Sequence, residues 1–341
     1  MRKTTIKDIA KKANVSIGTV SRALNSNGPV SPSTKQAILK IAKELNYVPS
    51  TPEKSFFMKG RSIIGIIVTE ISNPFLSEMV SRLLDVFRSE GYMVMLCNSN
   101  YDQGVVEDFV NELTQFNAVG LVIISTTIQD AALLDRINSS FKVVSIGDEN
   151  PGMPTIEWHD RTSTIKLIQH LIDFGHRKIA CVGHHSTALQ TMRRLEGYKE
   201  CLQANGIPIR EEYILGVVDN TSLNTGYVRT HELLKLEDPP TAIFFINDYY
   251  AMFGYKAVKE AGLQIGEDIS FVGFDDYPLS TMISPSLTTV RVQIGHVIQF
   301  CKDILIRMIE DESYTPSASI VATEVILRES VKPNTQKQNN I

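Results

Sequence analysis

The sequence has few of the residues that would indicate a metal centre or a disulfide framework. Its 341 residues include four cysteines and a single tryptophan. The cysteines, Cys97, Cys181, Cys201 and Cys301, lie far apart, and neither a Cys-x-x-Cys pair nor a Cys/His pair has metal-ligand spacing. We therefore expect four reduced thiols, no bound metal and no cofactor.

Signals for catalysis and for targeting are also missing. The chain has no GxSxG, no GxGxxG after its first predicted strand and no P-loop, so a hydrolase, a dinucleotide enzyme and a nucleotidase are all disfavoured. It has no stretch apolar enough to span a membrane, and the first residues lack the apolar core of a signal peptide. We expect a cytoplasmic protein that is not an enzyme.

The two signs of charge are distributed unevenly along the chain. Residues 1–61 hold twelve Lys or Arg and three Asp or Glu, a net charge of +9, whereas the whole chain carries −4, which leaves −13 on the remainder. Two or three domains are expected at this length. A basic head on an acidic body suggests that the head binds a polyanion, although a Lys-rich surface can also serve solubility alone.

Residues 1–49 are predicted to form three short helices. Thr5 stands three residues before Asp8, a variant of the capping box, and Asn14 can end that helix in the left-handed conformation. Ser16 caps a second helix, and Ser31-Pro32 opens a third. Two helices joined by about three residues have the spacing of a helix-turn-helix, although a generic three-helix bundle is an alternative. The apolar positions are Ile6, Ile9, Ala10, Ala13, Val20, Ala23, Leu24, Ala37, Ile38, Ile41, Ala42 and Leu45.

The predicted outer face of the second helix favours DNA over a generic bundle. Hydroxyl side chains donate to phosphates, and the Arg22 guanidinium can bridge O6 and N7 of a guanine. One short helix reads only a few base pairs, so we expect a homodimer on a pseudo-palindromic site. This face carries Ser16, Ile17, Gly18, Thr19, Ser21, Arg22 and Asn25.

Beyond Ser62, apolar strands alternate with amphipathic helices in two halves of similar plan. This alternation predicts an α/β body of two doubly wound parallel-sheet subdomains, with a ligand at the carboxyl ends of the strands. The predicted domains are a head (1–49), a linker (50–61), a two-subdomain body (62–330) and a polar tail (331–341). The tail has no leucine heptad, so we expect no tetramer.

The motifs of the head resemble those of the LacI/GalR family of bacterial regulators. The matching stretches are 5–10, 15–16, 19–22 with Asn25, and 45–49. The resemblance implies a transcriptional regulator, most often a repressor, with the helix from Ser16 in the major groove of operator DNA. It assigns most of the hydrogen-bonded base readout to Arg22 and a thymine methyl contact to Ile17. Thr5 and Tyr47 complete the expected DNA-binding residues of the head.

The linker contains three consecutive apolar residues, Phe56, Phe57 and Met58, which is unusual for a solvated segment. The resemblance implies that this stretch becomes a helix on DNA and that Phe56 acts as a minor-groove wedge. Glu53 is unfavourable near phosphates, and a flexible linker is the alternative.

The resemblance extends to the body and implies a periplasmic-binding-protein-like fold, in which the chain crosses between the subdomains near 160, 290 and 322. It implies that a small effector, a sugar or sugar derivative, binds in the cleft. Phe75 matches a stacking residue or is simply core. Arg194 and Asn247 match a charged donor and an amide of the family's ligand site. Asp275 matches a carboxylate that binds a sugar or a purine, and Asp160 completes the set.

Several neighbours of these residues are given other roles. Arg193 is expected in solvent, Asp276 is expected to be structural, and Asp248 resembles a helix N-cap.

Trp158-His159-Asp160 replaces a frequent Asp-Asn pair, and Thr221 replaces an aromatic, so this pocket differs from those of relatives. His184-His185 follows a strand end and is expected near the cleft, but it has no metal cluster around it and is expected to be structural. A solute-binding protein and a sugar-processing enzyme are disfavoured rivals, since the adjacent Asp275 and Asp276 make a poor acid/base pair.

Overall fold

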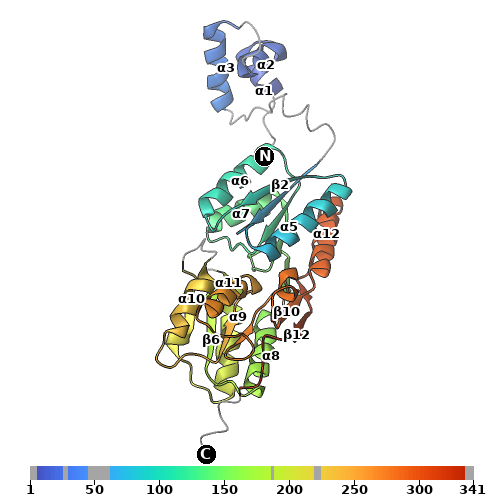
Figure 1. Cartoon of the computed structure of the whole chain (residues 1–341). Helices are drawn as coiled ribbons and strands as arrows, with labels where there is room; N and C mark the ends of the chain where they lie inside the picture. The colour runs from blue at the N-terminus through green and yellow to red at the C-terminus, as the bar shows by residue number, and fades with distance from the viewer. Residues whose placement is uncertain (1–5, 26–29, 45–61, 186–187, 219–223, 335–341) are drawn as a thin grey trace, which may run out of the picture. The chain divides into compact units, whose positions relative to one another are not determined.

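The computed structural model describes residues 6–25, 30–44, 62–185, 188–218 and 224–334 (Figure 1). The chain divides into two compact units, Met1–Arg61 and Ser62–Ile341. No helix in these ranges is long and apolar enough to cross a membrane. Thr5, Tyr47 and Phe56, with the whole 50–61 linker, lie outside the described residues.

The head consists of three helices, α1 (Ile6–Ala13), α2 (Ile17–Asn25) and α3 (Pro32–Glu44), as the sequence predicts. Asn14 has a φ of 53°, so the predicted left-handed end of α1 is confirmed. Both predicted caps are confirmed too: Ser16 Oγ accepts from the Thr19 N–H at 3.1 Å, and Ser31 Oγ accepts from the Thr34 N–H at 3.2 Å. The core of the head contains Ile9, Ala10, Val20, Ala23, Ile38 and Ala42.

One predicted core position of the head is wrong. Ala37 is exposed, whereas Ile38 and Ala42 are buried and Ile41 is half-buried. At 100° per residue, the stripe through positions 38, 41 and 42 leaves position 37 on the solvent side of α3. Leu45 lies outside the described residues, and the Leu24 side chain is not described.

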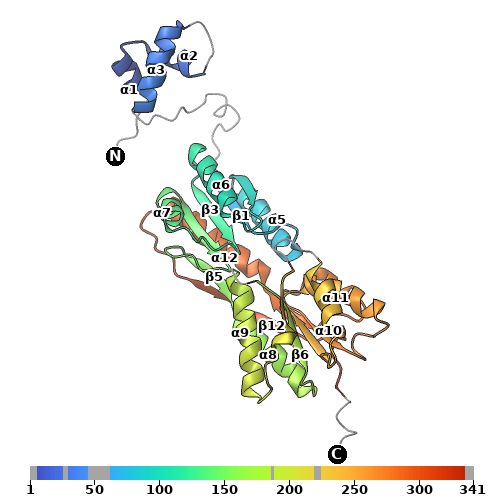
Figure 2. The same cartoon turned by 90° about the vertical axis from the view of Figure 1, so that its left-hand side faces the viewer.

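The first subdomain of the body is built on a parallel six-stranded sheet. Its strands are β1 (Ile63–Val68), β2 (Met93–Asn98), β3 (Gly120–Ile124), β4 (Lys142–Ile146), β5 (Thr155–Trp158) and β11 (Ser319–Val321), in the order β11-β5-β4-β3-β1-β2. β1 is buried at all six residues, which requires cover on both faces of the sheet. The cover is supplied by α5 (Pro74–Ser89) packed with α12 (Ile294–Glu310), and by α6 (Gln103–Gln115) packed with α7 (Ala131–Ser140) (Figure 2).

The second subdomain repeats this plan with a four-stranded parallel sheet. Its strands are β6 (Ile179–His184), β7 (Ile214–Gly216), β8 (Ala242–Phe245) and β9 (Ser270–Val272), in the order β7-β6-β8-β9. Its helices pack in two pairs, α8 (Asp160–Asp173) with α9 (Leu189–Ala204) and α10 (Thr225–Leu234) with α11 (Asp248–Glu260). Two strands depart from the all-parallel expectation, because β10 (Thr289–Val292) and β12 (Thr323–Ile326) pair antiparallel.

The chain passes between the subdomains three times. β5 ends at Trp158 and α8 begins at Asp160; β10 ends at Val292 before α12; and β11 ends at Val321 before β12. The expected crossings near 160, 290 and 322 are therefore confirmed, and the two sheets are joined by three short connections.

The body continues beyond residue 330. Val331 is buried, the Lys332 carbonyl lies 3.2 Å from His176 Nε2, and the Asn334 N–H donates to the Phe174 carbonyl at 2.8 Å. Residues 331–334, which were expected in the polar tail, pack on the second subdomain because their backbone groups and Val331 find partners there.

Candidate functional site

A cleft between the two subdomains lies at the carboxyl ends of strands from both sheets. The space between the walls of this cleft, including its solvent-filled mouth, is about 670 Å³. Parallel strands present their carboxyl ends at one edge, so the loops that follow them meet there. The lining includes Thr69 and Glu70 after β1, Tyr101 after β2, Ser125 after β3, Asp148 after β4, His185 after β6, Val217 after β7, Asn247 after β8 and Asp275 after β9.

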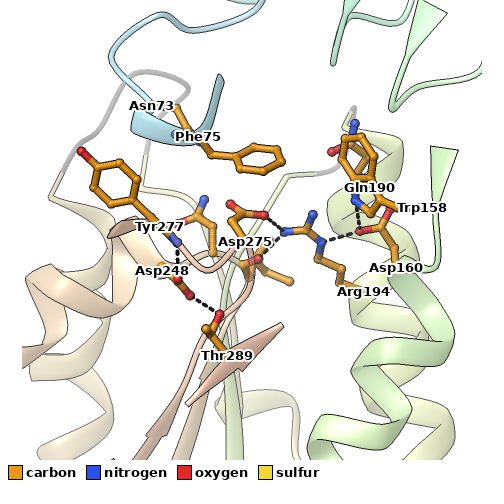
Figure 3. A network of polar contacts seen from close by, with 12 residues as sticks. Asn73, Phe75, Trp158, Asp160, Gln190, Arg194, Asp248, Asp275, Tyr277 and Thr289 are labelled. Atoms are coloured by element: carbon orange, nitrogen blue, oxygen red, sulfur yellow. Dashed lines mark hydrogen bonds and ion pairs between the residues drawn. The ribbon is translucent and has the colours of Figure 1, made fainter. Parts of the chain in front are cut away.

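Arg194 on α9 is the centre of a buried ion network below this cleft (Figure 3). It is 3% exposed, and its Nε lies 2.7 Å from Asp160 Oδ1. Its Nη1 lies 3.2 Å from Asp275 Oδ1 and donates to the Ile246 carbonyl at 2.6 Å. Burial alone would lower the pKa of Arg194, but the charges of Asp160 and Asp275 outweigh it and raise this pKa. The guanidinium therefore stays charged and holds the two carboxylates together.

Asp275 is placed by an unusual backbone conformation. Its φ is 110°, a region that residues other than glycine rarely occupy, and its N–H donates to the Val290 carbonyl at 2.8 Å. Backbone strain of this kind persists only where the surrounding structure imposes it, and it is concentrated at functional sites. Burial raises the pKa of Asp275 to about 8, although Arg194 acts in the opposite direction. Burial and the Arg194 charge therefore act in opposite directions on the protonation of Asp275.

Asp160 is the first residue of α8 and is buried on the other side of Arg194. Trp158 Nε1 also donates to Asp160 Oδ1, at 3.1 Å. Burial raises the pKa of Asp160 against the opposing effect of Arg194. Asp160, which was expected to bind the effector, is not among the residues that line the cleft. It lies behind Arg194 and orients the guanidinium.

The next carboxylate along the chain, Asp276, has the structural role that the sequence suggests. Its Oδ2 lies 2.6 Å from Arg291 Nε and its Oδ1 lies 2.5 Å from Arg328 Nη2. Both arginines approach it from the β10–β12 side of the subdomain. Asp275 and Asp276 therefore point to different partners.

The predicted N-cap role of Asp248 is wrong. Asn247 is the N-cap of α11, because its Oδ1 accepts from the Tyr250 N–H at 2.9 Å. Asp248 is instead fully buried and accepts hydrogen bonds from Thr289 Oγ1 at 2.5 Å and Ser280 Oγ at 2.6 Å. Burial raises the pKa of Asp248 to about 7. Asn247 lines the cleft, and with its oxygen used in the cap, its amide nitrogen is the end that can donate to a ligand.

Phe75 belongs to the hydrophobic core and also lines the cleft. It lies in the first turn of α5, where Asn73 Oδ1 caps its N–H at 3.0 Å. It is 4% exposed, and its ring meets Trp158 edge to face, with centroids 5.9 Å apart and planes at 79°. Trp158 thereby fixes the ring, and one apolar surface of Phe75 is left for a ligand.

The sequence did not lead us to expect Asp148, Gln190 or Tyr101 in the lining, whereas His185, which was expected near the cleft, does line it. Asp148 Oδ2 accepts from Thr127 Oγ1 at 3.0 Å, and burial raises its pKa to about 6. Gln190 Nε2 donates to Ser125 Oγ at 3.1 Å, and the Tyr101 and His185 rings stack with centroids 4.8 Å apart. Both contacts join one subdomain to the other. The position of Asp148 directly after a buried strand was a usable signal, whereas the two cross-cleft contacts have none in the sequence.

Other residues considered from the sequence lie away from the cleft lining. Arg193, expected in solvent, is partly exposed and pairs with Glu157 at 2.8 Å and Glu149 at 3.4 Å. Thr221 is outside the described residues.

Throughout the described ranges, no group of three or more His, Cys, Asp or Glu is arranged to hold a metal ion. All four cysteines are free and buried.

The head presents most of the predicted DNA-contacting face to solvent. Ser16, Ile17, Gly18 and Arg22 are exposed, Ile17 by 47%, and Thr19 is half-buried. Arg22 Nε donates to the Gly18 carbonyl at 3.1 Å, which holds the guanidinium along α2. Ser21 and Asn25 lie on α2, but their side chains are not described.

Comparisons with known proteins cover nearly the whole chain. Residues 5–50 match the bacterial regulatory proteins of the lacI family, and residues 168–331 match the periplasmic binding protein-like domain. The HTH-type transcriptional repressor PurR of Photobacterium profundum is 28% identical over 332 residues, 96% of this chain and 98% of the relative. The ribose operon repressor of Halalkalibacterium halodurans is 30% identical over 339 residues, 98% of this chain and 99% of the relative.

The solved structures include a LacI family transcriptional regulator from Enterococcus faecium with bound ribose, which is 25% identical. Its TM-score is 0.71, and the alignment covers 80% of this chain and all of that one. The head motifs, the two-subdomain body and the full-length relatives agree: the chain belongs to the LacI family of bacterial regulatory proteins.

Proposed function

We propose that this protein is a sequence-specific transcriptional regulator, a repressor, whose affinity for operator DNA is set by a small polar metabolite in the cleft of the body. The observation that carries this proposal is the presence of two separate binding surfaces in one chain. An exposed helix face with Arg22 and Ile17 can read DNA, and an enclosed cleft around Arg194 can hold a small molecule.

On the DNA side, the proposal rests on α2. Arg22 is its exposed cation, and Ser16 and Thr19 place hydroxyl groups at the helix N-terminus, where phosphate contacts are common. A single α2 reads too few base pairs for a specific site, so the regulator acts as a homodimer on a pseudo-palindrome. Phe56 in the linker is the minor-groove wedge of each half-site. Thr5, Tyr47, Ser21 and Asn25 complete the surface.

On the ligand side, the chemistry favours a sugar or sugar derivative. Asp275, Asn247 and Arg194 supply acceptors and donors in a buried setting, and Phe75 supplies an apolar face. Such a site favours a compound rich in hydroxyl groups, because each buried polar group left unmatched is costly, about 1–3 kcal/mol. The ribose in the Enterococcus faecium regulator is a ligand of this class.

A sugar-processing enzyme would need two carboxylates facing one another across the substrate. Here Asp275 is held by Arg194, and Asp276 is held by Arg291 and Arg328. Asp275 and Asp276 are therefore not arranged as an acid/base pair.

Coupling between the two surfaces follows from the construction of the body. A ligand that touches both subdomains changes their relative orientation only through its different affinity for the two arrangements. The stacked Tyr101–His185 pair and the Gln190–Ser125 hydrogen bond are cross-cleft contacts that ligand binding would reinforce or break.

The test uses the full-length protein in two steps. Operator sites are first selected from random duplex DNA, and the selected sequence should be a pseudo-palindrome bound by a dimer. A thermal-shift screen of sugars and sugar derivatives then supplies ligands, and each hit should change operator affinity by about 5- to 150-fold in one direction. Selection of no common sequence, or ligands that bind without changing operator affinity, would contradict the proposal. Sedimentation showing a stable tetramer would contradict the dimer.

A further inference from the structure

The wall of the cleft is strongly acidic. Glu70, Asp148 and Asp275 line it, and Asp160 lies directly behind Arg194. Among the lining residues that the structure describes, Arg194 alone carries a permanent positive charge, and His185 is charged only when protonated. The lining therefore holds more potential negative charge than positive charge.

The one guanidinium is already occupied by protein groups. Arg194 contacts Asp160, Asp275 and the Ile246 carbonyl, and its carbon Cζ lies 3.6 Å from the centre of the Phe274 ring. An anionic ligand would have to take Arg194 from one of two buried carboxylates and leave that carboxylate without its counter-charge. Breaking a buried ion pair in this way is strongly unfavourable.

The helix N-termini at the cleft, which are the other common anion sites, already hold side-chain acceptors. Asn73 caps α5 and Asn247 caps α11. α9 has no side-chain cap of its own, but Asp148 lies at its start, where the Gln190 backbone N–H favours the charged form of Asp148. A phosphate or carboxylate would find each of these positions taken.

One oxygen of Asp148 has no well-formed hydrogen bond from the part of the protein that the structure describes, although the Gln190 backbone N–H is near enough to favour the charged carboxylate. The residue is 1% exposed and lines the cleft, and its Oδ2 accepts from Thr127 Oγ1. Its Oδ1 is buried with no hydrogen-bond partner of good geometry among the described residues. Buried acceptors in folded proteins are almost always paired, so an oxygen left without such a bond in a cleft wall marks the position of a ligand donor.

We propose that the cleft selects a polyhydroxy ligand that is uncharged or cationic, that it rejects phosphorylated and carboxylated ligands, and that Asp148 Oδ1 accepts a hydrogen bond from a hydroxyl or ammonium group of the selected ligand. This inference rests on the proposed function only in taking the cleft as the ligand site. It narrows the ligand class and adds Asp148 to the residues that recognise it.

The test compares sugars that share a skeleton and differ in charge. Ribose is compared with ribose 5-phosphate, and glucose with glucosamine, glucose 6-phosphate and glucuronate, by calorimetric titration of the full-length protein. On each skeleton that binds, the neutral or amino sugar should bind at least about 10-fold more tightly than its anionic counterparts. An anionic sugar that binds as tightly, or that is alone in binding, overturns the proposal and leaves the proposed regulator intact.

If no sugar of either set binds, this proposal fails together with the sugar part of the proposed function, whereas selection of an operator remains an independent result. If sugars bind with the expected charge preference but do not change operator affinity, the inference about ligand charge is supported and the proposed regulatory coupling is contradicted.

A pair of variants tests Asp148 itself. Asp148→Asn keeps the shape and removes the charge, and should weaken the neutral sugar by about 10- to 150-fold, the usual worth of a hydrogen bond to a charged group. The same variant should reduce the difference in affinity between neutral and phosphorylated sugars. Glu149→Gln is the matched control, because it makes the same charge change one residue away on a side chain that is 60% exposed and paired with Arg193. Equal effects of the two variants, or none from Asp148→Asn, would refute the role of Asp148. If a variant fails to fold, the comparison of sugars on the wild-type protein still tests the charge preference of the cleft.

Discussion

Tyr101 stacks face to face on His185, with ring centroids 4.8 Å apart and ring planes 11° apart. Tyr101 follows β2 of the first subdomain and His185 follows β6 of the second, so this pair spans the cleft. The Tyr101 φ is 63° and that of Asn100 is 48°, two consecutive residues in the left-handed region. A strained backbone thus places the ring that meets the opposite subdomain.

Removal of this ring should weaken ligand binding. An aromatic pair contributes about 0.5–1.5 kcal/mol beyond its buried area, so Tyr101→Ala should raise the Kd of the ligand about 2- to 12-fold through a less stable closed cleft. Tyr227→Ala is the control, because Tyr227 pairs with His231 within α10 and does not line the cleft. Calorimetric titration measures both variants, and an unchanged Kd for Tyr101→Ala would separate the stack from ligand binding.

Adjacent arginines should differ greatly in their effect on stability. Arg194→Met leaves Asp160 and Asp275 buried without their counter-charge, and should lower the free energy of unfolding by about 3–5 kcal/mol. Arg193→Met breaks only partly exposed pairs with Glu157 and Glu149 and should cost about 0–1 kcal/mol. Urea unfolding of the body transition compares the two. Similar losses would mean that the Arg194 network does not stabilise the fold as a buried ion pair should.

Stability should depend on pH through Asp248. Burial raises its pKa in the folded protein to about 7, from an unfolded value of about 3.9. Between about pH 4 and pH 7 the folded state therefore binds a proton that the unfolded state lacks, so the stabilisation is complete at low pH and is lost as the pH rises. In wild type, this proton makes the free energy of unfolding fall by up to about 1.4 kcal/mol per pH unit between about pH 4 and pH 7. Asp248→Asn should remove this contribution to the slope. Asp85→Asn, at an exposed position, is the control, and parallel curves for wild type and Asp248→Asn would contradict the expectation.

Arg22→Ala should reduce specific more than non-specific DNA binding. Loss of a bidentate base contact costs about 1–3 kcal/mol on the selected operator, whereas random DNA is bound mainly through phosphates. Lys11→Ala, an exposed charge on α1, should weaken binding to both DNAs about equally. Fluorescence anisotropy at several salt concentrations measures both terms. Equal losses on operator and random DNA for Arg22→Ala would identify Arg22 as a phosphate contact.

Phe56→Ala tests the linker. If Phe56 wedges into the minor groove, the variant should bend the operator less and bind it less tightly, while the affinity of the cleft for its ligand stays the same. Circular permutation of the operator reports the bend, and titration reports the ligand. An unaltered bend angle and operator affinity would favour the flexible linker.

Much of the fold could be predicted because its signals are local. Helix caps at Ser16 and Ser31 and the left-handed Asn14 act within one turn of chain, and the sequence shows them directly. The β-branched run that became β1 indicates a strand covered on both faces. The antiparallel pairing of β10 with β12 has no comparable local signal, because it joins segments more than thirty residues apart.

The candidate site could be predicted only in part. Arg194, Asn247 and Asp275 stand in recognisable motifs, and the structure places all three at the cleft. Asn247 was expected at the cleft and lines it, but the residue that caps α11 was not readable, since Asn247 forms the cap that was expected of Asp248.

The alternation of strands and helices over much of residues 63–272, the basic head with its exposed Arg22 and the family motifs could all be read from the sequence, because each depends on residues close together in the chain. Only the folded structure shows that Asp148 and Tyr101 line the cleft and that Tyr101 stacks on His185 across it. These three residues follow strands of two different sheets, and their contacts exist only where three crossings of the chain bring the carboxyl ends of those sheets together. Burial then set the chemistry of Asp148: it raised the pKa of the carboxyl group and left Oδ1 without a well-formed hydrogen bond from the described residues, and neither effect can be read from an aspartate in a linear chain.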